Sequence, residues 1–597
     1  MIDVFVPPPQ SDPMPIRPSP RHAPSSALPG AGRTAAHRAS PLPWASAVLL
    51  TLGMAACGGG GHTAGAAPAP SRQPADSGTH HPSALMPLPG NIPAGGPSPA
   101  APGTGPAGST AAGATHPGNH GPASPTPPSP QADICQPLLA QQPRLLAGQD
   151  NSPLPTRPRP ATGVAQADPT YHSCVVRLTA NDGGRNHTFL RHDYARRQAF
   201  NADSSRLLLY ALDGYWHLVD ARTLRPLKRL AGPAGDAEPQ WHPTDPNTLF
   251  YLNTNGLGMQ IHRLDVASNT STLVADMGAQ VRRRWPEADT AWTRSEGSPS
   301  ADGRYWCFQA ERSRDWQTLG VFTWDMQTGQ IIGSLDVQER PDHVSMSPSG
   351  QYCVVSSDGP MGTRAYTRDF TSPYFPGQGT QPWLQLLGKS EHSDIALDAA
   401  REDTFVAVDY GSGMVTMTHL PSGRKTPLFS VYPGRTATAL HFSGKAYRKP
   451  GWVLVSTYAE HDPDHPARSL RNGPQQQWLH RKLFAVSLTA SPQIRPIAHV
   501  DSTLHDRDSP GHANDLDPYW GEPQASVNPD FSRMLFNSTW NGERNLDTEA
   551  FLVAVPHDAL DAPGDSASAR QATGPFNPFQ PPSHRQDSTS GAPLPLP

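Results

Sequence analysis

Seven polar side chains recur at one position of a repeated sequence phrase, and three of them are histidines. Most stand six residues before an aligned turn residue, although Glu238 requires a turn that is one residue longer. Imidazole nitrogens combined with amide or carboxylate oxygens are ligands for divalent first-row metals. In chain order the seven are Arg197, Glu238, Glu296, His343, His392, His441 and Gln524.

The chemistry of this set admits two interpretations. His343, His392 and His441, with Gln524, offer nitrogen and oxygen ligands for a cation, and convergent polar groups in a concavity indicate a site. Glu238 and Glu296 add negative charge, and Arg197 is suited to binding a carboxylate. The alternative is structural, because a buried histidine or carboxylate also serves to hydrogen-bond a neighbouring loop. Both interpretations stay open at this point.

The elements that position these residues follow from the phrase itself. It consists of a short strand, a turn rich in Asn, Asp, Ser, Pro and Gly, a more apolar strand, a third strand and another turn. Its copies lie roughly 40 to 60 residues apart for the most part, which is the spacing of repeats that bury their faces only against neighbours. Short strands repeated in this way predict an all-β chain folded as a seven-bladed β-propeller. The copies begin near residues 198, 239, 298, 344, 393 and 442, and the last occupies residues 522–540.

A propeller brings the seven polar positions together, because the innermost strand of each blade lines the central channel. The positions are equivalent in every blade, so their side chains are expected to converge at one channel mouth. A strand at residues 173–180, upstream of the first copy, is expected to complete the seventh blade. Closure of this kind removes an exposed sheet edge. The propeller domain is therefore predicted over residues 134–556.

The N-terminal region reads as a targeting segment. Arg33, His37 and Arg38 precede an apolar run at residues 44–56, which is too short to span a bilayer and fits a signal-peptide core. The ending Met-Ala-Ala-Cys resembles a bacterial lipobox, which implies cleavage after residue 56 and a lipid on Cys57. Gly58 after it implies transfer to the outer membrane. The alternative is an ordinary secretory signal with a coincidental cysteine.

Composition sets the remaining boundaries. Residues 57–133 and 557–597 are rich in Pro, Gly, Ala and Ser, which predicts a disordered tether and a disordered tail.

Cys135, Cys174, Cys307 and Cys353 form an even set, compatible with two disulfides of undetermined pairing in an oxidising compartment. The net charge of −4 comes without a basic stripe, which argues against nucleic-acid binding.

Several phrases are similar to oligogalacturonide lyases, which are seven-bladed propellers that hold manganese through histidines and a glutamine. The resemblance implies that His392 matches the region of the catalytic base and that His441 is a metal ligand. In the last blade the family has two histidines flanking a proline, where this chain has Glu522 and Gln524; Glu522 remains a possible carboxylate ligand. The outer-hairpin turns also resemble WD-repeat propellers. The lyase-like phrases are EPQWHPTDPNTLFYLNTNG (238–256), EHSDIALD (391–398), HFSG (441–444) and EPQASVNPDFSRMLFNSTW (522–540).

Two functions follow as hypotheses. The first is an envelope-anchored binding or interaction propeller that takes a ligand or an envelope protein at a channel mouth rimmed by Glu and His. The second is a metal-dependent lyase that acts on uronate oligosaccharides, in which a manganese ion stabilises the charge that develops when the proton beside the carboxylate is removed.

Overall fold

A computed structural model describes residues 132–181, 189–371, 374–375, 380–433, 436–461, 477–505 and 515–561. The predicted signal peptide, the lipidation site Cys57 and nearly all of the predicted tether and tail lie outside these residues. Among the described helices, none has the length and apolar character needed to cross a bilayer.

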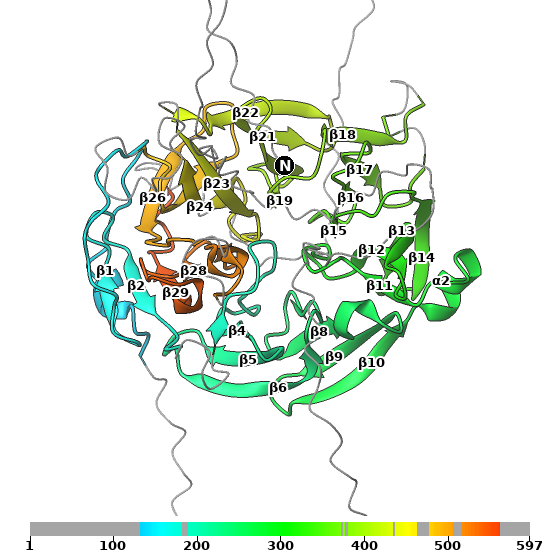
Figure 1. Ribbon diagram of the computed structural model, residues 1–597, viewed down its shortest axis with the longest axis horizontal. Helices are drawn as coiled ribbons and strands as arrows, with labels where there is room; N and C mark the ends of the chain where they lie inside the picture. The colour runs from blue at the N-terminus through cyan, green and yellow to red at the C-terminus, as the bar shows by residue number, and fades with distance from the viewer. Residues whose placement is uncertain are drawn as a thin grey trace, which may run out of the picture.

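The described strands form seven antiparallel sheets arranged as a ring around a common centre (Figure 1). Six sheets have four strands and one has five. The innermost strand of each sheet is the first strand of the corresponding copy of the repeated phrase. This arrangement confirms the predicted all-β, seven-bladed propeller.

The first three blades use consecutive strands. The first contains β3 (Leu190–Arg191), β4 (Arg206–Ala211), β5 (Tyr215–Asp220) and β6 (Pro226–Ala234). The second contains β7 (Gln240–Trp241), β8 (Thr248–Leu252), β9 (Gln260–Asp265) and β10 (Thr270–Asp276). The third contains β11 (Thr290–Trp292), β12 (Tyr305–Arg312), β13 (Gln317–Asp325) and β14 (Gln330–Asp336), and the helix α2 (Gly278–Arg284) precedes it.

The next three blades follow the same order. The fourth contains β15 (His343–Met346), β16 (Tyr352–Ser356), β17 (Thr363–Thr367) and β18 (Trp383–Leu387). The fifth contains β19 (Ser393–Leu397), β20 (Asp403–Asp409), β21 (Met414–His419) and β22 (Arg424–Ser430). The sixth contains β23 (Ala437–Ser443), β24 (Trp452–His461), β25 (Lys482–Ser487) and β26 (Ile494–His499).

The seventh blade joins the two ends of the described chain. Its strand order is β1-β2-β29-β28-β27, so β2 (Cys174–Arg177) pairs with β29 (Glu549–Ala554). The predicted closing strand is therefore confirmed, and β1 (Ala165–Ala167) adds a fifth strand outside it. The inner strands of this blade are β27 (Ser526–Val527) and β28 (Arg533–Ser538). A short helix, α1 (Gln136–Leu139), precedes β1, and the described residues also contain three 3-10 helices, at Thr254–Gly256, Pro518–Gly521 and Asn545–Asp547.

The hydrophobic core lies between neighbouring blades. Each blade buries alternate side chains of its middle strands against the next; Met534 and Phe536 of the seventh blade, for example, pack with Leu454 and Leu483 of the sixth. Two disulfides strengthen the ring. Cys135–Cys174 ties the segment around α1 to β2, and Cys307–Cys353 joins β12 to β16 across two blades.

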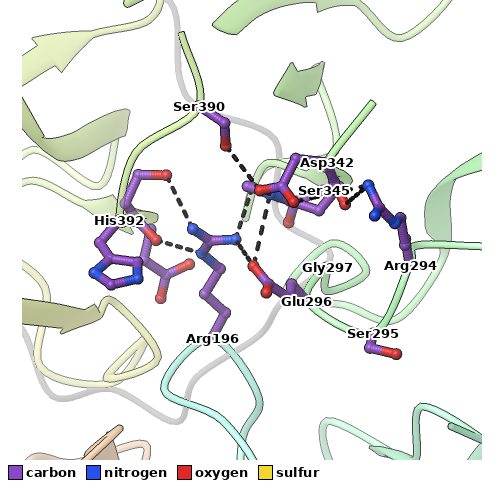
Figure 2. Close-up of polar contacts among 12 residues, drawn as sticks. Arg196, Arg294, Ser295, Glu296, Gly297, Asp342, Ser345, Ser390 and His392 are labelled. Carbon is purple, nitrogen blue, oxygen red and sulfur yellow. Dashed lines mark hydrogen bonds and ion pairs between the residues drawn. The ribbon is translucent and has the colours of Figure 1, made fainter. Parts of the chain in front are cut away.

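Two inner strands are interrupted by loops. In the first blade, β3 pairs with the end of β4, and pairing resumes only at Phe200, which bridges to Leu207. In the third blade, β11 pairs with the end of β12, and the ladder resumes where the Ser300 N–H donates to the Tyr305 carbonyl. The intervening residues, 192–199 and 293–299, form the first-blade loop and the third-blade loop. These loops bring Arg196 and Glu296 to the cluster of polar side chains drawn in Figure 2, where they meet residues of the fourth and fifth blades.

Candidate functional site in the channel

Arg196 of the first-blade loop lies at the centre of the polar cluster (Figure 2). Its Nη1 donates to Glu296 Oε2 at 2.6 Å and contacts His343 Nε2 at 2.8 Å. Its Nε donates to the Ser393 carbonyl at 2.5 Å. The guanidinium is 3% exposed and therefore forms a buried link between the first, third, fourth and fifth blades.

The contact with Arg196 fixes the protonation of His343. Arginine only donates, so His343 Nε2 accepts and the proton lies on Nδ1. That nitrogen faces Asp342 Oδ2 at 3.2 Å, and Ser390 donates to the same oxygen at 2.8 Å. Burial and the charge of Arg196 lower the pKa of His343 well below 6.5, and burial raises the pKa of Asp342 to about 6. His343 is thus a neutral, fully engaged imidazole.

A second group consists of His392, His441 and Glu522, whose candidate ligand atoms all lie within 4.8 Å of one another. We call it the channel triad. His441 Nε2 and Glu522 Oε2 are 2.7 Å apart. His392 Nδ1 donates to the Leu440 carbonyl at 3.0 Å, which leaves a lone pair on Nε2. That nitrogen is buried and has no hydrogen-bond partner among the described residues.

Aromatic side chains enclose the channel triad. The Tyr458 ring stacks on the His441 ring at 5.0 Å with an interplanar angle of 11°. Tyr194 of the first-blade loop meets the same imidazole edge-on at 5.6 Å. The two imidazoles themselves have centroids 4.1 Å apart. The imidazole of His441 is therefore held between aromatic rings on more than one side.

Burial sets the charge of the channel triad. It lowers the pKa of His392 well below 6.5, with the neighbouring His441 and Arg196 adding to the effect, and it lowers the pKa of His441 to about 3. Burial also raises the pKa of Glu522 well above 4.5. The two imidazoles are consequently uncharged at neutral pH, and burial favours the protonated form of Glu522 beside His441 Nε2.

The residues of the channel triad fit a divalent first-row metal ion. Two imidazoles and one carboxylate are a donor set that such ions use, and His392 Nε2 has a lone pair that no described residue engages. His343 belongs to a different group, with Glu296 and Asp342, whose charge already faces Arg196 and Arg294. The structure thus pairs His392 and His441 with Glu522, while His343 and Gln524 have other partners.

The other three predicted residues hold the loops that cover the channel. Arg197 binds Asp193 and donates to the Ser295 carbonyl at 2.5 Å. Glu238 accepts from the backbone N–H groups of Thr293 and Ser295. Gln524 accepts from Arg191 Nη1 at 3.0 Å and donates to the Tyr519 carbonyl. These contacts anchor the first-blade loop, the third-blade loop and the segment before β27.

The ring of predicted residues is a buried layer and not an open mouth. Each of the seven, and Glu522, is at most 8% exposed. Sequence reasoning also missed Arg196, the residue with the most contacts across the channel. The count of six residues before the turn selects its neighbour Arg197, because nothing in the repeat shows that the inner strand is interrupted at residues 192–199. The adjacent pair of Arg196 and Arg197 was the one feature of the sequence that could have pointed to Arg196.

The fold and this centre define a seven-bladed β-propeller whose channel holds a buried His-His-Glu group beside an arginine. No protein-family model matches the chain, and no curated protein matches its sequence.

Three solved structures are similar in fold. An oligogalacturonate lyase in complex with manganese is 16% identical, with 70% of this chain and 99% of that chain covered and a TM-score of 0.43. The oligogalacturonate lyase of Vibrio parahaemolyticus is 14% identical, covering 66% and 99%, with a TM-score of 0.44. The WD40 domain of Neurospora crassa Pan2 is 11% identical, covering 61% and 89%, with a TM-score of 0.35. At these identities the likeness concerns the fold alone, and no activity is transferred from it.

Proposed function

We propose that this protein is a binding propeller of the bacterial envelope whose channel triad holds one divalent metal ion. Two observations support this proposal. The buried Nε2 of His392 has no hydrogen-bond partner among the described residues, and candidate ligand atoms of His392, His441 and Glu522 lie within 4.8 Å of one another. A buried lone pair with no donor is costly unless something occupies it. A metal ion would supply that partner, and Glu522 would bind the ion as a carboxylate.

The burial of the channel triad favours a binding role over catalysis. His392 is 8% exposed, His441 1% and Glu522 6%. Three protein ligands would leave one position of a tetrahedral ion unfilled, as in catalytic sites. The burial of all three residues restricts the access of a substrate to that position. A bound ion would therefore tie together the fifth, sixth and seventh blades, next to the seam at which the ring closes.

Metal content of the purified protein tests this proposal. We expect about one equivalent of Mn or Zn after loading and gel filtration, measured by inductively coupled plasma mass spectrometry, since the three ligands serve a single ion. His441→Ala is expected to lose the metal. His419→Ala is the matched control, because His419 belongs to the exposed Asp398–Glu402–His419 group outside the channel. Absence of stoichiometric metal in the unmodified protein would contradict the proposal.

A lyase acting on uronate oligosaccharides is the second candidate. It is favoured by the same neutral Nε2 of His392, which is chemically able to accept a proton. The first-blade loop would have to move for a substrate to reach this atom. Incubation with oligogalacturonides, followed by the ultraviolet absorbance of unsaturated uronates, tests the activity. Absorbance that grows with the unmodified protein and not with His392→Ala would establish the lyase, and its absence would exclude it for this substrate.

The envelope location rests on the lipobox-like sequence that ends at Cys57, which lies outside the described residues. We expect the protein to label with radioactive palmitate in a bacterial host and to fractionate with the outer membrane. Cys57→Ser should abolish both properties, since the thiol that carries the lipid is gone. An unlabelled but secreted wild-type protein would support the ordinary secretory signal instead.

A further inference from the structure

The two loops divide the channel into two compartments. Ser298 of the third-blade loop donates to the Arg196 carbonyl at 2.6 Å, and Gln240 donates to the Gly297 carbonyl at 3.1 Å. On one side of these contacts lies the buried layer with the channel triad. On the other side lies a cavity of about 380 Å³, bordered by the turns that follow the inner strands. We call it the turn-side cavity.

The turn-side cavity shares no lining residue with the channel triad. Its walls come from the first, second, third, sixth and seventh blades, so it occupies the end of the channel opposite to the predicted ring. Its size falls in the range of small-molecule sites, which are commonly about 300–1,000 Å³.

The polar groups of the turn-side cavity are mainly donors. Lys445 is 3% exposed, and its ammonium is held by Asp394 at 2.9 Å. His242 accepts backbone N–H groups of Thr244 and Asp245 on Nδ1, so Nε2 carries the proton and donates. Arg448 adds a second cation at the exposed rim.

Two carboxylates lie near these donors. Asp394 already pairs with the Lys445 ammonium, which leaves Arg448 and His242 as donors for an added anion, and Asp203 belongs to the lining itself. The Asp203 carboxylate accepts from the N–H of Ser205 at 3.0 Å and from its hydroxyl at 2.5 Å, and so closes its own turn. Apolar side chains form a further part of the lining, beside neutral polar residues. Phe200 is fully buried, the Trp241 indole nitrogen is bound to the Ala199 carbonyl, and Pro243, Pro299 and Pro529 complete the lining.

We infer that the turn-side cavity is a binding site for a small organic anion that carries an apolar ring or chain. The anionic group would bind near Arg448 and the Nε2–H of His242, and the apolar body would pack against Phe200, Trp241 and the prolines. The site is separate from the channel triad, so it stands whether or not a metal ion binds there.

Phenylacetate and its neutral isostere phenylacetamide test this inference by isothermal titration calorimetry on the full chain. We expect saturable binding of phenylacetate that is at least about tenfold tighter than that of phenylacetamide, since one charge-assisted contact separates the two probes. Arg448→Gln should weaken phenylacetate binding several-fold, and Ala301→Trp should abolish it by filling the cavity that Ala301 lines.

Two exposed positions outside the cavity provide the controls. Arg424→Gln and Ala490→Trp make the same changes of charge and volume on other surfaces and should leave binding unchanged. Thermal melting confirms that each variant is folded. Equal affinity for the two probes, no saturable binding of phenylacetate, or full binding by Ala301→Trp would each overturn the inference.

Discussion

Arg196 contributes to the propeller mainly through the groups that it pairs. Its partners Glu296 and His343 are 5% and 2% exposed, so removing the guanidinium leaves a carboxylate buried without its counter-charge. The loss of one member of a buried pair costs far more than the loss of a pair in water. The cost of a substitution at Arg196 is therefore expected to differ sharply from that at a surface arginine.

Arg196→Met is expected to lower the free energy of unfolding by about 3–5 kcal/mol, measured by chemical denaturation. Arg284→Met is the matched control, because its pair with Asp336 has the same 2.6 Å separation but side chains that are 52% and 53% exposed. There we expect a loss of at most about 1 kcal/mol. The charge of Arg196 lowers the pKa of His441, so the variant should also raise that pKa in an NMR titration. Equal losses in the two variants would contradict this account.

The ionisation of Glu238 makes the stability of the folded protein depend on pH, and the direction of that dependence follows from its pKa. Burial raises its pKa to about 7 from 4.5. Below pH 4.5 the carboxyl is protonated in both the folded and the unfolded chain. Between pH 4.5 and about 7 only the unfolded chain ionises, so stability falls as pH rises through this window.

Glu238→Gln removes that ionisation. The stability of the wild type relative to the variant is therefore expected to decrease from pH 4.5 to 7 by roughly 2–3 kcal/mol, as measured by denaturant titrations across the range. Parallel profiles for the two proteins would show that Glu238 is ionised in the folded state throughout.

The types of the site residues could be predicted, but their grouping could not. Repeat equivalence placed His392 and His441 in one layer, because the position of an inner-strand residue follows from the repeat. Glu522 was predicted as a possible ligand because the last blade has this residue where the lyase pattern has a histidine. The separation of His343 from the other imidazoles depends on Arg196, whose loop has no counterpart in the periodic pattern.

At the scale of the element, the strands themselves were predictable. Alternating buried positions and turn residues recur in every blade, and the structure places a sheet at each copy. The first-blade and third-blade loops were not predicted, since an interruption of an inner strand leaves no change in hydrophobic period. The pairing of the four cysteines was also open, because a disulfide requires Cα atoms that the fold brings close.

The disulfide Cys307–Cys353 joins β12 to β16 with a sequence separation of 46 residues. We expect the double variant Cys307→Ala, Cys353→Ala to lose about 2–4 kcal/mol of stability and to keep its secondary structure, because the surrounding strand pairing is unaffected. Thermal melts and circular dichroism measure both properties. A reducing agent should shift the melting midpoint of the wild type and leave the double variant less affected. A midpoint identical in wild type and variant would show that the bridge adds nothing.

For the whole molecule, ring closure depends on a strand from the other end of the chain. Val175 of β2 pairs with Val553 of β29. The sequence predicted this strand as the one that completes the seventh blade, because residues 173–180 lie upstream of the first copy and closure removes an exposed sheet edge. The additional strand β1 was not predicted, as three polar and small residues give no strand signal.

A chain that begins at residue 182 lacks β1, β2 and the Cys135–Cys174 bridge. We expect it to aggregate or to melt well below the full chain, because the edge of β29 is then unpaired. A chain that begins at residue 132 keeps every described element and should melt like the full chain. Size-exclusion chromatography and thermal melting distinguish the two. A monomeric, equally stable chain from residue 182 would contradict the role assigned to closure.

The pairing of β2 with β29 also determines when, during synthesis, the protein is able to complete its fold. Synthesis proceeds from the N-terminus, so β2 is made early and waits for a partner that is among the last strands to be made. Contacts of such long sequence separation form slowly and late. The local Cys135–Cys174 bridge, with a separation of 39 residues, is able to form long before them. A nascent chain that stops before Glu549 therefore exposes a blade edge at both ends of the incomplete ring. We expect such chains to be recognised by proteases while the finished ring is not.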